Sequence, residues 1–168
     1  MHTEEYLDFV TDQDEVIEAK SRREIYELGL KNFRVVNVFL KNSEGKLWIP
    51  RRTAQKKAFP SCLSMSMGGH VSAGESYEEA VAREMLEELR IDISEHSLTR
   101  VAKLTPHEHG TNAFMVVYEL LTNEVPDYNR DDFSEYYWLT PAELRERIKS
   151  GDPCKGDIPP LLMWVYGE

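Results

Sequence analysis

Residues 69–91 read GHVSAGESYEEAVAREMLEELRI, and this stretch decides the fold because it contains the clearest helix pattern in the chain. The part from Glu75 to Leu89 contains neither proline nor glycine, the two residues that most often interrupt a helix. Its apolar side chains recur at the spacing of one helical face: Ala80, Val81, Met85 and Leu89. The pattern predicts a helix that packs one side against a core.

The same stretch contains three acidic residues that a helix brings together. Glu84, Glu87 and Glu88 are three and four residues apart, so they share a helical face. Like charges at this spacing destabilise an isolated helix by roughly a few tenths of a kcal/mol per pair. Arg83 can offset part of this by pairing with Glu87, and a hard divalent cation can offset more. Oxygen ligands suit magnesium, whereas zinc prefers histidine and cysteine, so the pattern predicts a magnesium site.

Glycines precede this helix at the positions where a ligand would approach it. Gly68, Gly69 and Gly74 allow sharp turns or close backbone contact, and a helix N-terminus favours phosphate. Such loops are common, so this feature supports a phosphate site only together with the acidic residues.

These residues match the Nudix box, whose pattern is G-x5-E-x7-R-E-U-x-E-E-x-G-U with U aliphatic. The specified glycine and charged positions are filled by Gly69, Glu75, Arg83, Glu84, Glu87 and Glu88. At residue frequencies of about 6–7% each, chance agreement at one starting point is on the order of one in ten million. The chain therefore resembles a Nudix protein. The late glycine of the pattern is Arg90 here, and a left-handed conformation at that residue would cost roughly 1 kcal/mol.

The resemblance implies an α+β fold, a Nudix-type α/β/α sandwich with a mixed β-sheet flanked by helices, in one domain over residues 1–168. It implies a hydrolase that cleaves a diphosphate linkage in a small phosphorylated substrate such as a nucleoside di- or triphosphate. Mg²⁺, or Mn²⁺ in its place, would be held at Glu84, Glu87, Glu88 and Gly69. Further candidate ligands from later loops are Glu108, Asp132 and Glu135.

The resemblance also assigns roles within the box. The catalytic residues would be Glu84, Glu87 and Arg83, with the identity of the general base left open between glutamates. Arg83 would orient the glutamates by ion pairing. Glu75 would support the loop or a second metal ion.

Segments outside the box resemble the branch of the family that is similar to isopentenyl-diphosphate isomerase. They are LDFVTDQDEVIEAKSR, LWIPRRTAQKKAFP and YYWLTPAEL. The isomerase uses a cysteine as proton donor, but that position is Gly68 here and Cys62 lies six residues away. Hydrolysis is therefore favoured over isomerisation. A non-catalytic module that senses a nucleotide is the other alternative, and the intact glutamate set argues against it.

Residues expected to bind the substrate are Arg51, Arg52, Lys57 and His70. The first three belong, with Lys56, to the densest basic group in the chain, which either holds a distal phosphate or forms a solvated loop. Neighbours on a strand face opposite ways, so one of the two arginines should reach the site. His107 and His109 are expected to be loop histidines without a site. Trp48, Tyr136, Tyr137, Trp138 and Trp164 are expected to be core or interface residues. The alternative is that an aromatic residue stacks on a nucleobase, and the first candidates for that are Phe39, Trp48 and Phe114.

The composition of the chain restricts the classes of molecule that it can bind and the compartment in which it is expected. The 168 residues carry a net charge of −10, which disfavours nucleic acid but allows a metal-bound phosphate compound. No apolar run approaches the roughly 20 residues that span a membrane, and the first ten residues do not read as a secretory signal. Cys62 and Cys154 form no CxxC pair, so we expect reduced thiols in a cytoplasmic protein. Dimers are common in the family that the chain resembles, so a homodimer is an expected assembly.

The remaining elements follow from local patterns. Strands are predicted at residues 6–10, 15–19, 34–40, 46–52, 61–67, 98–105, 114–121 and 136–139. Helices are predicted up to residue 28 with Ser21 as cap, at 141–148 with Thr140 as cap, and from residue 159 or 160 onward. Pro50 should place its strand at an edge or beside a bulge, and Gly68-Gly69 should end the strand before the box. Strands and helices do not alternate strictly, which predicts a mixed sheet.

Overall fold

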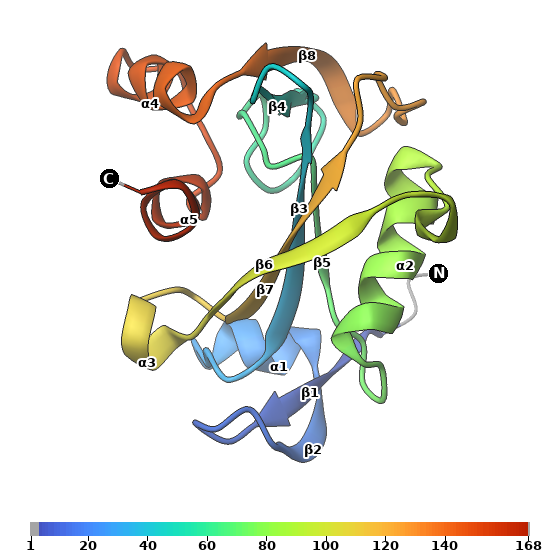
Figure 1. The fold of residues 1–168 in the computed structure, drawn as a ribbon. Helices are drawn as coiled ribbons and strands as arrows, with labels where there is room; N and C mark the ends of the chain where they lie inside the picture. Colours follow the sequence, from blue (N-terminus) through green and yellow to red (C-terminus); the bar gives the residue numbers. More distant parts are fainter. Residues whose placement is uncertain (1–3, 168) are drawn as a thin grey trace.

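Strand β3 is the centre of the main sheet in the computed structural model, which describes residues 4–167 (Figure 1). The strands are β1 (Tyr6–Val10), β2 (Val16–Ser21), β3 (Arg34–Lys41), β4 (Leu47–Arg52), β5 (Met67–His70), β6 (Leu98–Leu104), β7 (Phe114–Leu121) and β8 (Phe133–Leu139). The helices are α1 (Arg22–Glu27), α2 (Tyr77–Leu89), η1 (Ile93–Glu95), α3 (Pro106–His109), α4 (Pro141–Lys149) and α5 (Ile158–Tyr166).

The main sheet is mixed and has the order β6-β7-β3-β4-β8. Strands β3 and β7 run parallel, and the other pairs are antiparallel. The second edge of β3 is divided between two partners. Strand β5 pairs with residues 35–38, and β4 meets β3 at Lys41 and Leu47 alone. Among residues 4–167, β5 has no strand partner other than β3, so its outer edge is free.

Alternation along β3 creates two cores, one on each face of the sheet. Val36, Val38 and Leu40 pack on one face with the apolar side of α2, including Val81, Met85 and Leu89. Phe39 packs on the other face with Leu144 of α4 and with Leu161 and Leu162 of α5. Figure 1 shows α2 on one side of β3 and the pair α4 and α5 on the other. The expected α/β/α sandwich with a mixed sheet is therefore confirmed.

Helix α2 begins at Tyr77, two residues after the predicted start at Glu75, because Ser76 caps it. Ser76 and Glu79 form a capping box, in which each side chain accepts a hydrogen bond from the other residue's backbone N–H. The helix ends at Arg90, which adopts the left-handed conformation with φ 54°. The chain thus keeps the exit geometry that favours glycine with an arginine in its place.

The strand before the box differs from the prediction. Residues 61–66 form isolated bridges at Leu63 and no strand, because Phe59 and Ser61 have positive φ and turn the chain. The strand β5 instead runs through Gly68 and Gly69, which were expected to end it. A Cβ on Gly69 would lie 2.6 Å from Cδ of Glu84, so glycine is required there by close packing.

Strand β4 also adjusts around its proline. It lies between β3 and β8 in the sheet order, and its pairing with β8 shifts register between Arg51 and Arg52, which fits a bulge beside Pro50. The carbonyl of Pro50 accepts a hydrogen bond from the backbone N–H of Ser64 (2.9 Å). The segment after the turn therefore covers the side of β4 that β3 leaves open.

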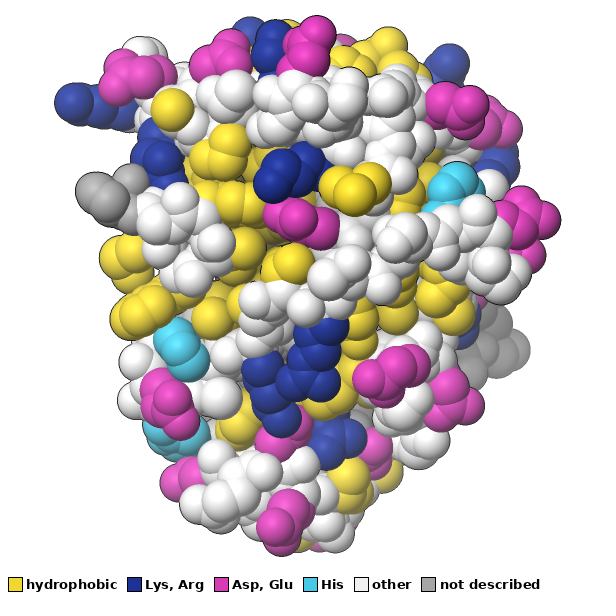
Figure 2. Space-filling model, viewed as in Figure 1, with side chains coloured by type: hydrophobic (Ala, Val, Ile, Leu, Met, Phe, Trp, Pro, Cys, Tyr) yellow, Lys and Arg dark blue, Asp and Glu magenta, His cyan; other side chains and the backbone are white. Residues whose placement is uncertain are grey.

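The surface carries both charge signs. In Figure 2, acidic side chains are dispersed across the visible face, and lysine and arginine side chains gather near its centre among exposed hydrophobic ones. None of the helices within residues 4–167 has both the length and the apolar character needed to cross a bilayer.

Candidate functional site

A cavity of about 950 Å³ surrounds the free edge of β5. One wall contains Gly69, Glu84 and Glu88, which belong to β5 and α2. The opposite wall contains groups from β3, α1 and the segment before α5. The cavity therefore reaches both faces of the sheet around one short strand.

Glu84 and Glu88 are one helical turn apart and both line the cavity. Burial raises the pKa of Glu84 even though Arg83 donates a hydrogen bond to it (2.8 Å). Burial, followed by the charges of Glu84 and Asp132, raises the pKa of Glu88 to about 8. Within the part of the chain that the structure describes, the Glu88 carboxylate has no hydrogen-bond or ion-pair partner. A cation beside Glu84 and Glu88 would stabilise their charged forms.

Glu87 does not join this pair. Its side chain is 59% exposed and contacts Arg83 at 3.5 Å. Among residues 4–167, no three histidine, cysteine, aspartate or glutamate side chains are grouped closely enough to hold one ion. The expected convergence of three glutamates is therefore incomplete, because the ion pair with Arg83 holds Glu87 outside the cavity.

Arg83 connects the helix to the loop before it. Its Nε and Nη2 donate to the two carboxylate oxygens of Glu75 (2.7 and 2.9 Å), and Nη1 donates to Glu84. Glu75 also accepts a hydrogen bond from the backbone N–H of Ser72 (2.8 Å). Arg83 lowers the pKa of Glu75, which is thus a charged structural group of the loop.

The basic residues between positions 51 and 57 lie in two different environments. Arg52 lines the cavity and donates from Nε to the carbonyl of Ala58 (3.0 Å). Lys56 also lines the cavity and pairs with Asp132. Arg51 points away and pairs with Glu135 (2.7 Å) and Asp152 (2.8 Å), and the exposed Lys57 does not line the cavity. Of the predicted substrate arginines, the structure brings Arg52 alone to the site.

His70 lines the cavity, where its surroundings keep it neutral. Its Nε2 is 2.7 Å from the hydroxyl of Tyr26, and its ring stacks on Phe33. Burial lowers the pKa of His70 to about 4, so at neutral pH it offers a hydrogen bond and no positive charge.

Other sequence candidates lie elsewhere. Phe39, Trp48 and Phe114 are at most 1% exposed and cannot stack on a substrate, whereas Tyr26 and Phe59 are exposed aromatic rings in the cavity lining. Of the later-loop candidates, Asp132 is the one near Glu88, since Glu135 pairs with Arg51 and Glu108 belongs to α3. His107 and His109, which were expected in a loop, lie in the short helix α3. Asp12 pairs with His107, and the backbone N–H of Thr105 donates to His109.

Several cavity residues were not predicted, among them Asn37, Lys155 and Asp157. Asn37 was detectable, because a single polar residue interrupts the apolar strand RVVNVFL. No local pattern marks Lys155 or Asp157, which reach the cavity because the chain returns to it before α5.

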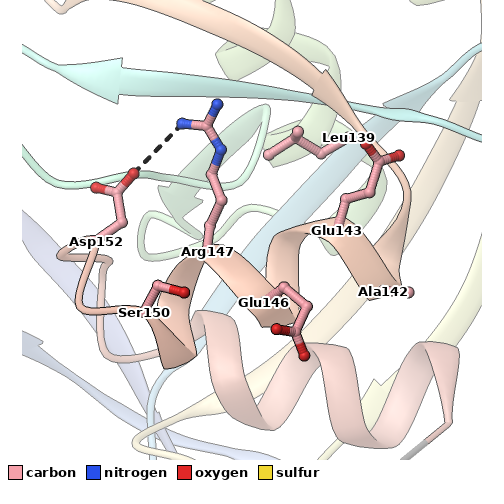
Figure 3. Close-up of a pocket in the computed structure, with 7 residues that line it drawn as sticks. All are labelled: Leu139, Ala142, Glu143, Glu146, Arg147, Ser150 and Asp152. Atoms are coloured by element: carbon pink, nitrogen blue, oxygen red, sulfur yellow. Dashed lines mark hydrogen bonds and ion pairs between the residues drawn. The ribbon is translucent and has the colours of Figure 1, made fainter.

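A second depression, of about 650 Å³, lies over α4. Figure 3 shows its charged lining, in which Arg147 pairs with Asp152 at 3.4 Å. Glu143 accepts the capping hydrogen bond of Thr140, so its carboxylate already has a structural role. This depression lacks the glycine loop of the first cavity.

Comparison with known proteins agrees with this geometry. The NUDIX domain family matches residues 31–161. An uncharacterized Nudix hydrolase of Nostoc sp. is 51% identical over 164 residues, covering 98% of this chain and 97% of the relative. A Nudix hydrolase of Deinococcus radiodurans is 43% identical over 166 residues, covering 99% of this chain and 96% of the relative.

The crystal structure of DR0079 from D. radiodurans superposes with a TM-score of 0.90 at 43% identity, covering 96% of this chain and 99% of that one. The family match spans most of the chain and includes the whole of the helix and loop described above. The chain therefore belongs to the Nudix hydrolases, a family of pyrophosphohydrolases that typically use a divalent metal ion.

Proposed function

We propose that this Nudix hydrolase cleaves a diphosphate linkage in a nucleoside di- or triphosphate, with Mg²⁺ held at Glu84 and Glu88. The observation that carries the proposal is the unpaired, half-buried carboxylate of Glu88 beside Glu84. Burying two carboxylates together is unfavourable unless a cation accompanies them.

The chemistry of the donors fits magnesium. Carboxylate oxygens of Glu84 and Glu88 are hard ligands, and Gly69 lies against Glu84 where a backbone oxygen could complete the set. Glu87 would become a further metal ligand once its carboxylate left Arg83 and bound the ion. When bound, Mg²⁺ would polarise phosphoryl oxygens and lower the pKa of a coordinated water.

The basic side chains that line the cavity support an anionic substrate. Burial lowers the pKa of Arg52, and burial together with the charge of Arg52 lowers the pKa of Lys155. Lys155 has no ion-pair partner within 4.0 Å in residues 4–167. A phosphate between Arg52, Lys56 and Lys155 would relieve this repulsion, and arginine can bind it with two hydrogen bonds.

The protein's own groups then have separate tasks. Arg52 and Lys56 would hold the phosphate that leaves. Glu84 or Glu87 would accept the proton of the attacking water, and Arg83 would fix the orientation of Glu84 through its bond to Glu75.

The two alternatives have weaker support. Isomerisation lacks its proton donor, because Gly68 occupies the cysteine position and Cys62 is not among the residues that line the cavity. A sensor without catalysis would gain nothing from the raised pKa of Glu88, which makes the metal-free protein less stable near neutral pH.

The test is phosphate and pyrophosphate release from a panel of nucleoside di- and triphosphates, with and without Mg²⁺. We expect metal-dependent turnover that Glu88→Gln reduces by about 100-fold or more, because the substitution removes a ligand charge. Glu78→Gln, on the exposed side of the same helix, is the matched control and should retain wild-type turnover. Wild-type turnover by Glu88→Gln would refute the ligand assignment, and no turnover by the wild type would favour the sensor.

A further inference from the structure

We infer that the side-chain amide of Asn37 binds the nucleobase and sets the base preference of the enzyme. This inference rests on the proposed function, since it assigns the part of a nucleotide that the carboxylates and the basic wall do not bind. It concerns the face of β5 opposite α2.

The register of β3 and β5 places Asn37 on that face. Val36 pairs with Gly69 and faces α2, so Asn37, which pairs with Gly68, faces the other way. Glu84 and Glu88 therefore bind on one side of β5, and Asn37 contributes to the cavity on the other. A substrate that crosses the free edge of the strand would contact both.

The amide is buried without its expected partner. Asn37 is 2% exposed, and its Nδ2 has no hydrogen-bond partner among the described residues. Leaving a buried donor unsatisfied costs about 1–3 kcal/mol, so such groups usually have a functional explanation. Asn37 lines the cavity, so a rotation of its amide would turn the unpaired Nδ2 toward a ligand there.

The neighbouring backbone makes room for this amide. A Cβ on Gly68 would lie 3.0 Å from Oδ1 of Asn37 and 3.1 Å from Sδ of Met65. Glycine at position 68 thus leaves the amide free of contact with a side chain on the paired strand. Gly68 thus has a separate role from Gly69, whose missing side chain makes room for Glu84.

The surroundings of Asn37 also provide surfaces on which a planar heterocycle could stack. Tyr26 and Phe59 expose aromatic rings to the same cavity, and exposed rings provide stacking surfaces for a base. The neutral His70 is held by Tyr26 and adds no charge. An amide offers one donor and one acceptor side by side, which matches the edge of a nucleobase.

The experiment compares base preference in the wild type and in Asn37→Ala. We would measure kcat/KM with Mg²⁺ for the diphosphates of adenosine, guanosine, cytidine and uridine, and for methyl diphosphate, which has no base. For Asn37→Ala, we expect the ratio of the preferred nucleotide to methyl diphosphate to fall about 10- to 100-fold, mainly through KM. Asn123→Ala, in a surface turn, is the matched control and should keep the wild-type ratio.

A second variant keeps the inference testable if Asn37→Ala does not fold. Gly68→Ala retains Asn37 but moves its amide, and should lower the same ratio by a smaller factor. Equal losses on all five compounds in Asn37→Ala, or an unchanged ratio in both variants, would overturn the inference while leaving the proposed function intact. Absence of turnover by the wild type on every compound would overturn both.

Discussion

Asp14 and Glu88 are both carboxylates withdrawn from water, but their surroundings differ. Asp14 accepts from Arg34 (2.7 Å), Lys103 (2.6 Å) and the hydroxyl of Tyr77 (2.7 Å). These contacts lower the pKa of Asp14 although burial opposes them. Glu88 has only burial and negative neighbours, which raise its pKa to about 8. The comparison separates a carboxylate that stabilises the fold from one whose charge awaits a ligand.

The largest effect that tests this comparison is on stability at Asp14. Replacing it by asparagine leaves Arg34 and Lys103 without their counter-charge at a side chain that is 5% exposed. We expect Asp14→Asn to lower the free energy of unfolding by about 2–3 kcal/mol, measured by urea denaturation, with turnover per folded molecule unchanged. The control is Asp12→Asn, at an exposed position, which should change stability by less than about 0.5 kcal/mol. An Asp14→Asn protein as stable as the wild type would contradict the distinction between Asp14 and Glu88.

A second test uses the pH dependence of the metal-free protein. The pKa of Glu88 is raised in the folded state from 4.5 to about 8, so the folded state binds a proton more tightly than the unfolded state. Stability should therefore fall as pH rises through this window, by on the order of 1–3 kcal/mol. Thermal unfolding at several pH values should show this fall in the wild type and a flatter profile in Glu88→Gln. Addition of Mg²⁺ should release a proton near pH 7, which calorimetry in two buffers would detect. The same pH dependence of unfolding in the wild type and in Glu88→Gln would contradict the assignment.

The smallest expected effect concerns the end of α2. Arg90 has φ 54°, a conformation that glycine adopts without strain. Its ion pair with Asp127 is exposed and contributes little. We expect Arg90→Gly to raise the free energy of unfolding by about 0.5–1 kcal/mol and to leave turnover unchanged, whereas Arg90→Val should lower stability.

The sequence predicted those elements whose structure depends on residues close together in the chain. The spacing of α2 and the caps Ser21 and Thr140 follow from neighbours within about four residues. The alternation that separates Arg51 from Arg52 was also predictable, although which of the two faces the cavity was not.

The features that depend on contacts between distant segments could not be predicted from the sequence. Gly68 and Gly69 were expected to end a strand, yet they lie within β5 because they pair with β3, and Glu84 and Asn37 leave little room for a side chain there. The sharing of Arg83 among Glu75, Glu84 and Glu87 changes which glutamates reach the cavity. Lys155 and Asp157 arrive from the far end of the chain, and no helical or strand period relates them to the box.

The unpaired edge of β5 has a consequence for the behaviour of the protein in concentrated solution. An open strand edge is a template on which another molecule can add a strand, and natural sheets protect such edges with charge. Here Glu88, Arg52 and Lys155 stand around the edge. The groups assigned to catalysis thus also act as a barrier to intermolecular β-pairing, so variants that remove several of these charges should aggregate more readily than the wild type.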